Sequence, residues 1–432
     1  MAFSISALNI ALTSFVIWRT FKILDYLQTK ISTKLLLFIV LPILAFADFM
    51  ASWLSSIIWL GPQGQIDTVL PMGSLALPLV QTPLRYASRI VGFYGLASFL
   101  WAFVYLSLNK KIRRYAYLPV VFLCILSFVG WVSYRAKNGS TIKVKIINES
   151  LQAQLPSIDA SGIDLVVFPE YGLDKTDNTN LNKRIIRTNN TQQKTYFIGS
   201  AQLFDSSYVG HINNMLMGNT VDGFVDNQYK YRLIPGGEDL SYVLNTFLRI
   251  IGQKGTINYF NYAHGVISGQ SQLHPFVIDA SLRVGAAVCS SIIAPQDYRL
   301  LASKGATLFT NSASLGIFKG SPVFSWQQKN LARFMAVANN RFFLQAANDA
   351  TIYALDNNGN SIAELKIMGY KDVIVQTNDL KTLYTYIGEW MAWLGGLILL
   401  AGLFYKKFKT LVLSSWLSYT KRCNSLRRKI CH

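Results

Sequence analysis

Three residues of this chain combine a nucleophile, a base and a cation. Cys289 follows the apolar segment VGAAV and precedes two serines, where a strand-to-helix turn would present its thiol. Glu170 ends another apolar segment, DLVVFPE, and would stand at the edge of a sheet where α/β proteins form ligand sites. Lys230 lies in the segment NQYKYRLIPGGEDL, and a cation near a thiolate lowers its pKa and stabilises a developing oxyanion. These residue types indicate nucleophilic catalysis by an activated thiol.

Each of the three residues also has an ordinary structural explanation. A free cysteine is often a small buried hydrophobe, so Cys289 could simply fill a core. Glu170 could be a surface acid at the end of a strand, and Lys230 could be a solvated lysine. The histidines of the same segment are His211, His264 and His274. None of them follows a strand-like run as Glu170 does, so a cysteine–histidine pair is not expected.

The distribution of cysteines favours a free thiol at position 289. The chain has 4 cysteines. Cys124 lies inside an apolar stretch, and Cys423 and Cys431 lie in a basic C-terminal tail. Cys289 therefore has no disulfide partner in the middle segment, and a lone thiol there calls for an explanation.

The middle segment, residues 137–384, has the pattern of a layered α/β domain, because short β-rich runs alternate with helix-like stretches. The predicted strands are 142–148, 164–170, 196–203, 211–219, 284–290, 306–312, 342–349, 351–360 and 372–379. The predicted helices are 179–193, 239–252, 296–304 and 325–339. Helix 239–252 presents one apolar face, formed by Leu240, Val243, Leu244, Phe247 and Ile251. We expect this face to pack on the core, and contact with lipid is the alternative.

The two ends of the chain have the composition of membrane helices. Of the 432 residues, 51% are hydrophobic and 15% are charged, which excludes a disordered chain. The apolar stretches long enough to span a bilayer are 4–26, 35–60, 86–107, 115–134 and 385–405. The first could instead lie at the interface, because charged residues crowd its end. The segment 62–85 is rich in Gly and Pro, and it is expected to form a loop or a re-entrant segment.

The formal charge of +19 would suggest nucleic-acid binding if it formed one basic surface. It is instead divided as +8 over residues 1–136, +4 over 137–384 and +7 over 385–432. The excess therefore flanks the apolar stretches, where basic residues mark the cytoplasmic side. The clusters at 30–34, 110–114 and 406–409 fall on one side if five helices alternate. This parity predicts a membrane part at 1–136 with about four helices, an extracytoplasmic domain at 137–384, a last membrane helix at 385–405 and a basic cytoplasmic tail at 406–432.

Taken together, the order and local sequences of Glu170, Lys230 and Cys289 resemble the apolipoprotein N-acyltransferase family of the nitrilase superfamily. FPEYGL (168–173) looks like the segment that carries the general base of that superfamily, and YKYRLIPGGE (229–238) looks like the lysine segment of the acyltransferases. RVGAAVCSSIIAPQDYRLLASKGATLFTNSAS (283–314) is similar to the nucleophile strand and the elements that follow it. Residues 326–360 and 75–105 also resemble that family, so that the likeness covers roughly 35–405.

The resemblance implies a four-layer αββα sandwich inserted in a bundle of membrane helices. It implies that Glu170 is the general base and that Cys289 attacks an ester of a phospholipid, phosphatidylethanolamine. Lys230, with a backbone N–H after Cys289, would stabilise the oxyanion. The acyl chain would then pass from a Cys289 thioester to the α-amino group of the diacylglyceryl-cysteine of a lipoprotein. Glu238 would support the site, and we expect the same of Ser290.

The sequence differs from the family at three places. Ser290 and Ser291 replace an aromatic residue and an acid, and the segment 313–317 lacks the family's Asn-Asp-x-Trp-Phe pattern. Five membrane helices are expected where the family has eight. These differences leave two alternatives open, namely an amidase or acyltransferase acting on another amine and a non-catalytic paralogue that binds lipid or lipoprotein. We expect a monomer in the bacterial inner membrane with its domain on the periplasmic face, and neither a cofactor, a metal nor nucleic acid as a partner.

Overall fold

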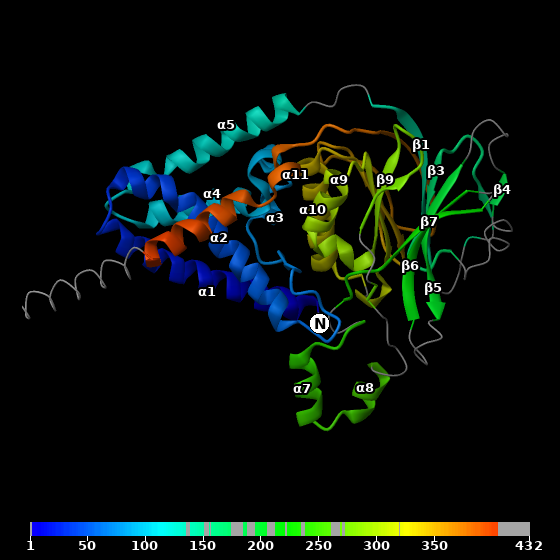
Figure 1. The fold of residues 1–432 in the computed structure, drawn as a ribbon, viewed down its shortest axis with the longest axis horizontal. Coiled ribbons are helices and arrows are strands. Elements are labelled where there is room, and N and C mark those ends of the chain that lie inside the picture. Colours follow the sequence, from blue (N-terminus) through cyan, green and yellow to red (C-terminus); the bar gives the residue numbers. More distant parts are fainter. Residues whose placement is uncertain are drawn as a thin grey trace, which may run out of the picture.

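A computed structural model describes most of the chain. The described residues are 2–134, 139–150, 155, 157–173, 185–187, 195–204, 212–220, 223–234, 238–260, 268–269, 273–318 and 320–404. The membrane-like helices gather on one side of the molecule and the sheet on the other, with helices α9 (Pro295–Ser303) and α10 (Pro322–Asn339) between them (Figure 1). The predicted basic tail lies outside the described residues.

Four of the predicted apolar stretches form helices long and apolar enough to cross a membrane. They are α1 (Ala2–Gln28), α2 (Thr33–Ile58), α4 (Ser88–Leu108) and α5 (Tyr117–Ser133). The last predicted stretch, 385–405, is divided at Gly388, because this glycine has a positive φ of 63°. The short helix α11 (Leu383–Ile387) precedes it, and an apolar helix over Trp390–Phe404 follows. The segment 62–85 is mostly loop and contains two short helical pieces, α3 (Ala76–Leu79) and η1 (Pro83–Ala87).

The sheet is curled, and its central strands are parallel. Its strands are β1 (Thr141–Glu149), β3 (Leu165–Val167), β5 (Tyr196–Phe204), β6 (Ile212–Thr220), β7 (Gly223–Tyr229), β8 (Phe276–Val277), β9 (Arg283–Val288), β10 (Leu308–Ser314), β11 (Phe343–Asn348), β12 (Ile352–Leu355), β13 (Ser361–Leu365) and β14 (Gly369–Gln376). Strands β2 (Ile158–Asp159) and β4 (Ile185–Arg187) form a separate two-stranded sheet. The main order is β7-β6-β5-β3-β1-β11-β10-β9-β8. Within this order, every neighbouring pair in the run β5-β3-β1-β11-β10-β9 is parallel. Their carboxyl ends therefore share one edge.

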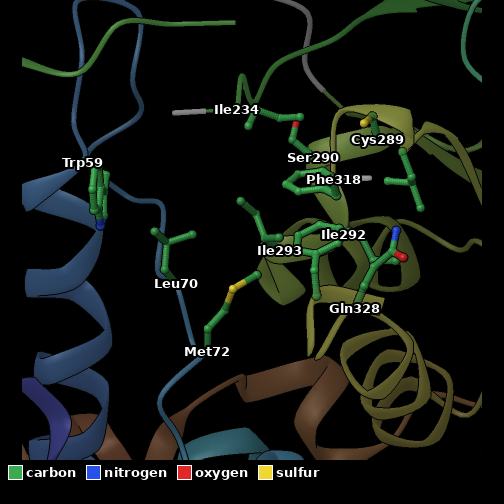
Figure 2. Close-up of a pocket in the computed structure, with 12 residues that line it drawn as sticks. Trp59, Leu70, Met72, Ile234, Cys289, Ser290, Ile292, Ile293, Phe318 and Gln328 are labelled. Atoms are coloured by element: carbon green, nitrogen blue, oxygen red, sulfur yellow. The ribbon is translucent and has the colours of Figure 1, made fainter. Parts of the chain in front are cut away.

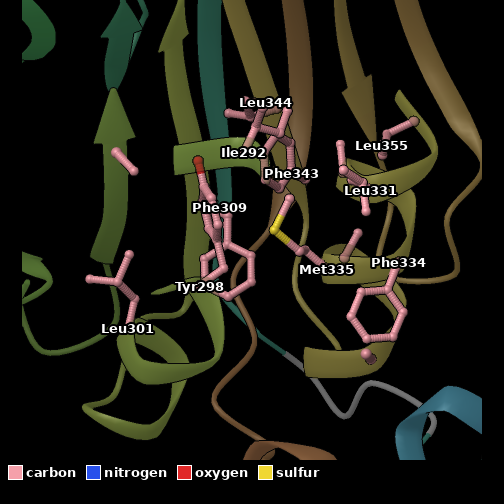
Figure 3. Packing of buried hydrophobic residues seen from close by; sticks show 14 of the residues in the cluster. Ile292, Tyr298, Leu301, Phe309, Leu331, Phe334, Met335, Phe343, Leu344 and Leu355 are labelled. Atoms are coloured by element: carbon pink, nitrogen blue, oxygen red, sulfur yellow. The ribbon is translucent and has the colours of Figure 1, made fainter. Parts of the chain in front are cut away.

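Both faces of this sheet are buried, as expected for parallel strands. In β1, the side chain of Ile146 joins the larger apolar cluster and that of its neighbour Ile147 joins a separate one. Helices α9 and α10 cover the face with the larger cluster, where Tyr298 of α9 packs against Phe309 and Phe343 of the sheet (Figure 3). The predicted α/β class is thus confirmed.

The helical bundle and the α/β domain pack directly on each other. Phe93 of α4 lies edge-on to Phe334 of α10, with 4.9 Å between the ring centroids. The guanidinium of Arg89, also in α4, is fully buried and donates to the carbonyl oxygens of Val337 and Asn357 at 3.1 and 2.7 Å. These contacts fix the domain on the ends of the apolar helices.

Two of the predicted helices differ from the structure. Helix α7 (Tyr242–Ile250) forms within 239–252, but its apolar face does not pack on the core. The side chains of Val243, Phe247 and Ile251 are 55%, 54% and 50% exposed, because α7 and α8 (Lys254–Asn258) project away from the sheet (Figure 1). The expectation of core packing is therefore wrong, and contact with lipid stays a prediction. In the predicted helix 179–193, residues 185–187 form strand β4, and the rest lies outside the described residues.

Candidate active site

The three candidate residues follow strands that run in the same direction. Glu170 comes after β3, Cys289 directly follows β9, and Lys230 directly follows β7. Strand β7 is antiparallel to β6, which is antiparallel to β5, so β7 ends at the same edge as the parallel strands. The curl of the sheet brings its two sides together, and the side-chain amide of Gln228 in β7 donates to the carbonyl of Ala286 in β9 at 3.1 Å. This closure explains how residues of distant strands share one site.

Lys230 is the centre of a buried ion-pair cluster. Its ammonium donates to Glu170 Oε1 at 2.8 Å and to Glu238 Oε1 at 2.5 Å. The exposed fractions of Lys230, Glu170 and Glu238 are 1%, 1% and 9%. Burial lowers the pKa of Lys230, but the two carboxylates outweigh it, so this pKa lies well above that of an ordinary lysine. Lys230 is therefore a fixed positive charge, which is what an oxyanion requires.

Glu170 is held in place by the ends of two neighbouring strands, β10 and β11. Its Oε2 accepts the backbone N–H of Ser314 at 3.1 Å, and its own N–H donates to the Ala313 carbonyl at 3.3 Å. The side chain of Asn348 at the end of β11 donates to its backbone carbonyl. Burial raises the pKa of Glu170 above the ordinary value of 4.5, although Lys230 and the Cys289 thiol act in the opposite direction. A base with a raised pKa is a better proton acceptor near neutrality.

Cys289 occupies the turn that its sequence predicts. It is the first residue of the 3-10 helix Cys289–Ile293, and its backbone has a positive φ of 44°. Its thiol is 2% exposed and lies 3.8 Å from the carbonyl oxygen of Ser314. Burial and the charge of Glu170 raise the pKa of this thiol well above its usual value, although Lys230 lowers it. The resting thiol is therefore neutral, and it requires a base before it can attack a carbonyl.

The two predicted supporting residues hold the loops around the site. Glu238 Oε2 accepts the backbone N–H of Ile234 at 2.9 Å, so the same carboxylate that binds Lys230 also closes the turn after it. The hydroxyl of Ser290 donates to the carbonyl of Arg232 and ties the nucleophile turn to the Lys230 loop. Ser290 thus acts on the position of Cys289 through the backbone.

An apolar cavity of about 60 Å³ opens beside Cys289 and Ser290 (Figure 2). On the side of the helical bundle it is lined by Trp59, Leu70 and Met72, and on the other side by residues such as Ile292 and Phe318. Because nearly all of these side chains are apolar, the cavity suits a hydrocarbon chain rather than a polar substrate. It connects the buried thiol with the end of α2, a helix that can span a membrane.

Arg232 is a buried residue of the site that the sequence analysis missed. Its guanidinium donates to both oxygens of Asp297 in α9 at 2.7 Å. It also donates to Asp67 at 3.1 Å and to the hydroxyl of Thr68 at 2.6 Å, both in the loop after α2. It therefore links the Lys230 loop, the helix after the nucleophile and a wall of the apolar cavity. Its position two residues after Lys230 could have marked it as a site residue. Its partners are too distant in the sequence to be inferred from it.

We expect Arg232→Gln to lower the free energy of unfolding by about 3 kcal/mol, because it leaves the buried Asp297 carboxylate without its cation. Thermal unfolding of the full chain in detergent measures this loss. The control is Arg249→Gln on the exposed surface of α7, which should unfold like the unchanged protein. Equal midpoints for the two variants would contradict the assigned role of Arg232.

Among the described residues, no group of three or more His, Cys, Asp and Glu side chains could hold a metal ion. The site as described consists of a thiol, two carboxylates, an ammonium and backbone N–H groups. These are the parts needed for covalent transfer of an acyl group through a thiol.

Comparisons with known proteins identify the family of the chain. The family model described as carbon-nitrogen hydrolase matches residues 143–386, more than half of the chain. The apolipoprotein N-acyltransferase of Wigglesworthia glossinidia brevipalpis is 24% identical over 333 residues, which are 70% of this chain and 64% of that protein. The protein of the same name from Shewanella oneidensis is 25% identical over 340 residues, 70% of this chain and 62% of its own length. The chain thus covers less than two thirds of these curated relatives.

Among solved structures, the carbon-nitrogen hydrolase of Helicobacter pylori G27 aligns with a TM-score of 0.39 and 12% identity. The alignment covers 55% of this chain and 89% of that structure. On the extent of the family match, this chain belongs to the carbon-nitrogen hydrolase family of the nitrilase superfamily, in which its curated relatives are named apolipoprotein N-acyltransferases.

Proposed function

We propose that this protein is an N-acyltransferase that moves an acyl chain from a phospholipid to a lipoprotein through a thioester on Cys289. The acyl donor is phosphatidylethanolamine, and the acceptor is the α-amino group of an N-terminal diacylglyceryl-cysteine. The observation that carries the proposal is the buried Glu170–Lys230 ion pair beside a neutral thiol, at the mouth of an apolar cavity. The names of the relatives support an apolipoprotein as the acceptor.

The first half of the reaction forms the thioester. Glu170 removes the proton of the Cys289 thiol while the sulfur attacks the ester carbonyl carbon. Lys230 and a backbone N–H after Cys289 stabilise the oxyanion that forms. The ester C–O bond then breaks, the proton passes from Glu170 to the leaving alkoxide, and lysophospholipid departs.

The second half transfers the chain to the acceptor. The amine attacks the thioester carbonyl, and Glu170 accepts a proton from the attacking nitrogen. The carbon–sulfur bond breaks, the amide forms, and the proton returns to the Cys289 sulfur. Both substrates are anchored in a membrane, which fits a site that faces the ends of apolar helices.

The proposal includes a topology and a location. Residues 137–384 form the catalytic domain on the periplasmic face of a bacterial inner membrane, the helices of 1–136 and 385–405 anchor it, and the tail 406–432 is cytoplasmic. The protein acts as a monomer in this proposal. The basic clusters beside the apolar stretches support this orientation.

Acyl-enzyme formation should fall as the medium is acidified, because protonation of Glu170 removes the base. The pKa of Glu170 is raised above 4.5, so the half-maximal rate should lie above pH 4.5. No loss is expected between pH 7 and 9, because the pKa of Lys230 is raised and the ammonium persists. Initial rates of thioester formation from below pH 4.5 up to pH 9 measure both the acid loss and the flat region. A midpoint at or below pH 4.5 would contradict the assignment of Glu170.

Expression in cells depleted of their own N-acyltransferase tests the proposed function. The mass of a lipoprotein N-terminus should show a third acyl chain with the unchanged protein and two chains with Cys289→Ala. Rescue of growth should follow the third chain. Diacyl lipoprotein and no rescue, with a folded protein in the membrane, would contradict the proposal.

A second candidate is an amidase or acyltransferase that acts on another amine. The serine pair after the nucleophile favours it, because Ser290 is engaged with the Arg232 carbonyl and neither of the two residues directly after Cys289 is an acid. Acylated Cys289 without transfer to lipoprotein in the depleted cells would favour this candidate. An unreactive Cys289 would favour a non-catalytic binding role.

A further inference from the structure

A second and larger cavity, of about 470 Å³, lies between the helical bundle and the α/β domain. Its walls come from α2, α4, α9, α11 and the C-terminal helix. The segment 67–72 separates it from the cavity beside Cys289, because Asp67 and Val69 line this cavity whereas Leu70 and Met72 line the other. Nothing in the proposed reaction uses this second cavity.

One side of the second cavity is apolar and aromatic. Phe49, Met50 and Trp53 of α2 line it together with Trp393 of the C-terminal helix. Trp393 is 57% exposed. These residues belong to helices with the composition of membrane segments, and tryptophan is typical of the membrane–water interface. This side of the cavity therefore suits the first part of an acyl chain.

The other side carries charge from the α/β domain. Arg299 of α9 lines the cavity, and the one polar contact that its guanidinium makes among the described residues is with the Thr385 carbonyl at 3.3 Å. Most of its five N–H donors thus remain available to a ligand, and a guanidinium fork matches the oxygens of a phosphate. At the rim, the carboxylate of Asp67 pairs with Arg232 and is still 60% exposed.

A third charge favours a zwitterionic ligand. Glu389 lines the cavity, and its two oxygens accept the backbone N–H groups of Phe93 and Tyr94 at 3.0 and 3.1 Å. The cavity therefore holds one cation and two carboxylates. Because Asp67 also pairs with Arg232, the charges at this cavity nearly balance, and a headgroup that bears both a phosphate and an ammonium complements both signs.

From this arrangement we propose that the second cavity binds a zwitterionic membrane phospholipid, distinct from the one at Cys289. Its phosphate contacts Arg299, its ammonium faces Asp67, and its glycerol and first acyl carbons lie against Phe49 and Trp53. The remainder of the chains extends into the bilayer beside the exposed Trp393. The inference does not depend on the proposed reaction, since it uses none of the residues assigned to catalysis.

Photo-labelling of the full-length protein in detergent tests this site. The probe is phosphatidylethanolamine with a diazirine on its acyl chain next to the ester. Label should appear in 295–299 of α9, which lines the cavity across from Phe49 and Trp53 and lies outside the membrane helices. Arg299→Gln should lower this label about tenfold, which corresponds to about 1.4 kcal/mol. Arg283→Gln, at the start of β9 and outside the cavity, is the matched control and should label like the unchanged protein.

A second variant tests the same cavity independently, so that the proposal remains testable if Arg299→Gln does not fold. Met50→Trp fills the apolar side of the cavity and should lower the same label while leaving label in 70–72, beside Cys289, unchanged. Equal labelling of 295–299 in both variants and the unchanged protein would overturn the proposal, and so would equal labelling by the phosphatidylglycerol analogue. Cys289→Ala should label as strongly as the unchanged protein, so failure of the proposed reaction and failure of this site are separate results.

Discussion

Replacing Cys289 with alanine should abolish thioester formation and lower acyl transfer by about 10,000-fold or more, because no other group in the site can carry the acyl chain. The thiol is buried and contacts Ser314, so removal of one sulfur atom leaves the packing around Glu170 and Lys230 in place. The rate of N-acylation of a diacylated lipopeptide by purified protein measures the effect. The control is Cys124→Ala in α5, an exposed thiol far from the site, which should keep full activity.

Activity of Cys289→Ala within tenfold of the unchanged protein would contradict the account. Cys289→Ser is an informative companion. Its hydroxyl is a poorer nucleophile and leaving group, so any acyl-enzyme it forms should be an oxygen ester that accumulates instead of turning over.

Lys230→Met should lower the rate of thioester formation by about 1000-fold, the scale expected for loss of a charged group that stabilises an oxyanion. Methionine is similar in length, but it leaves the buried carboxylates of Glu170 and Glu238 facing each other without a cation. The pKa of Glu170 should rise further, since Lys230 now lowers it. The variant should therefore also reach half of its maximal rate at a higher pH than the unchanged protein.

The control for this prediction is Lys254→Met, which changes an exposed lysine at the start of α8. Rates and pH profiles of both variants, with thermal unfolding as a check on folding, separate a catalytic loss from a structural one. A Lys230→Met enzyme that keeps its rate within tenfold and its pH midpoint unchanged would show that the cation has no role in catalysis.

The difference after the nucleophile looks less damaging in the structure than in the sequence. Ser291 stands where the related family has an acid, a group that could orient Lys230 or the substrate. In this chain Glu170 and Glu238 both bind the Lys230 ammonium and orient it from two sides. The serine pair therefore leaves the ion-pair cluster around Lys230 intact. Its effect concerns the apolar cavity beside Cys289, which Ser290 lines.

Much of the site could be predicted because its parts are local. Glu170 and Cys289 each follow a run of apolar residues, and such runs form buried parallel strands whose ends share one edge. Strand β7, by contrast, has the mixed sequence GFVDNQY and was not predicted, although it positions Lys230. Its pairing depends on β6, a partner that periodicity within β7 cannot reveal.

The remaining differences concern contacts between distant segments. The Arg232 cluster joins residues that are 65 and 165 positions apart, and a single sequence gives no measure of such pairings. Helix α7 shows the limit of amphipathic patterns. An apolar stripe predicts that something covers it, but the stripe does not say whether the cover is protein or lipid. The structure excludes the core of the protein for Val243 and Phe247.

The central claim is that Cys289 becomes acylated by a phospholipid with Glu170 as its base. The most direct test is the mass of the Cys289 peptide after the purified full-length protein is incubated with phosphatidylethanolamine and no acceptor. We predict a mass increase of one acyl chain on Cys289 that hydroxylamine removes and that Glu170→Gln lowers by about 1000-fold in rate. An unmodified Cys289 in folded protein, or acylation that is equally fast in Glu170→Gln, would contradict the account.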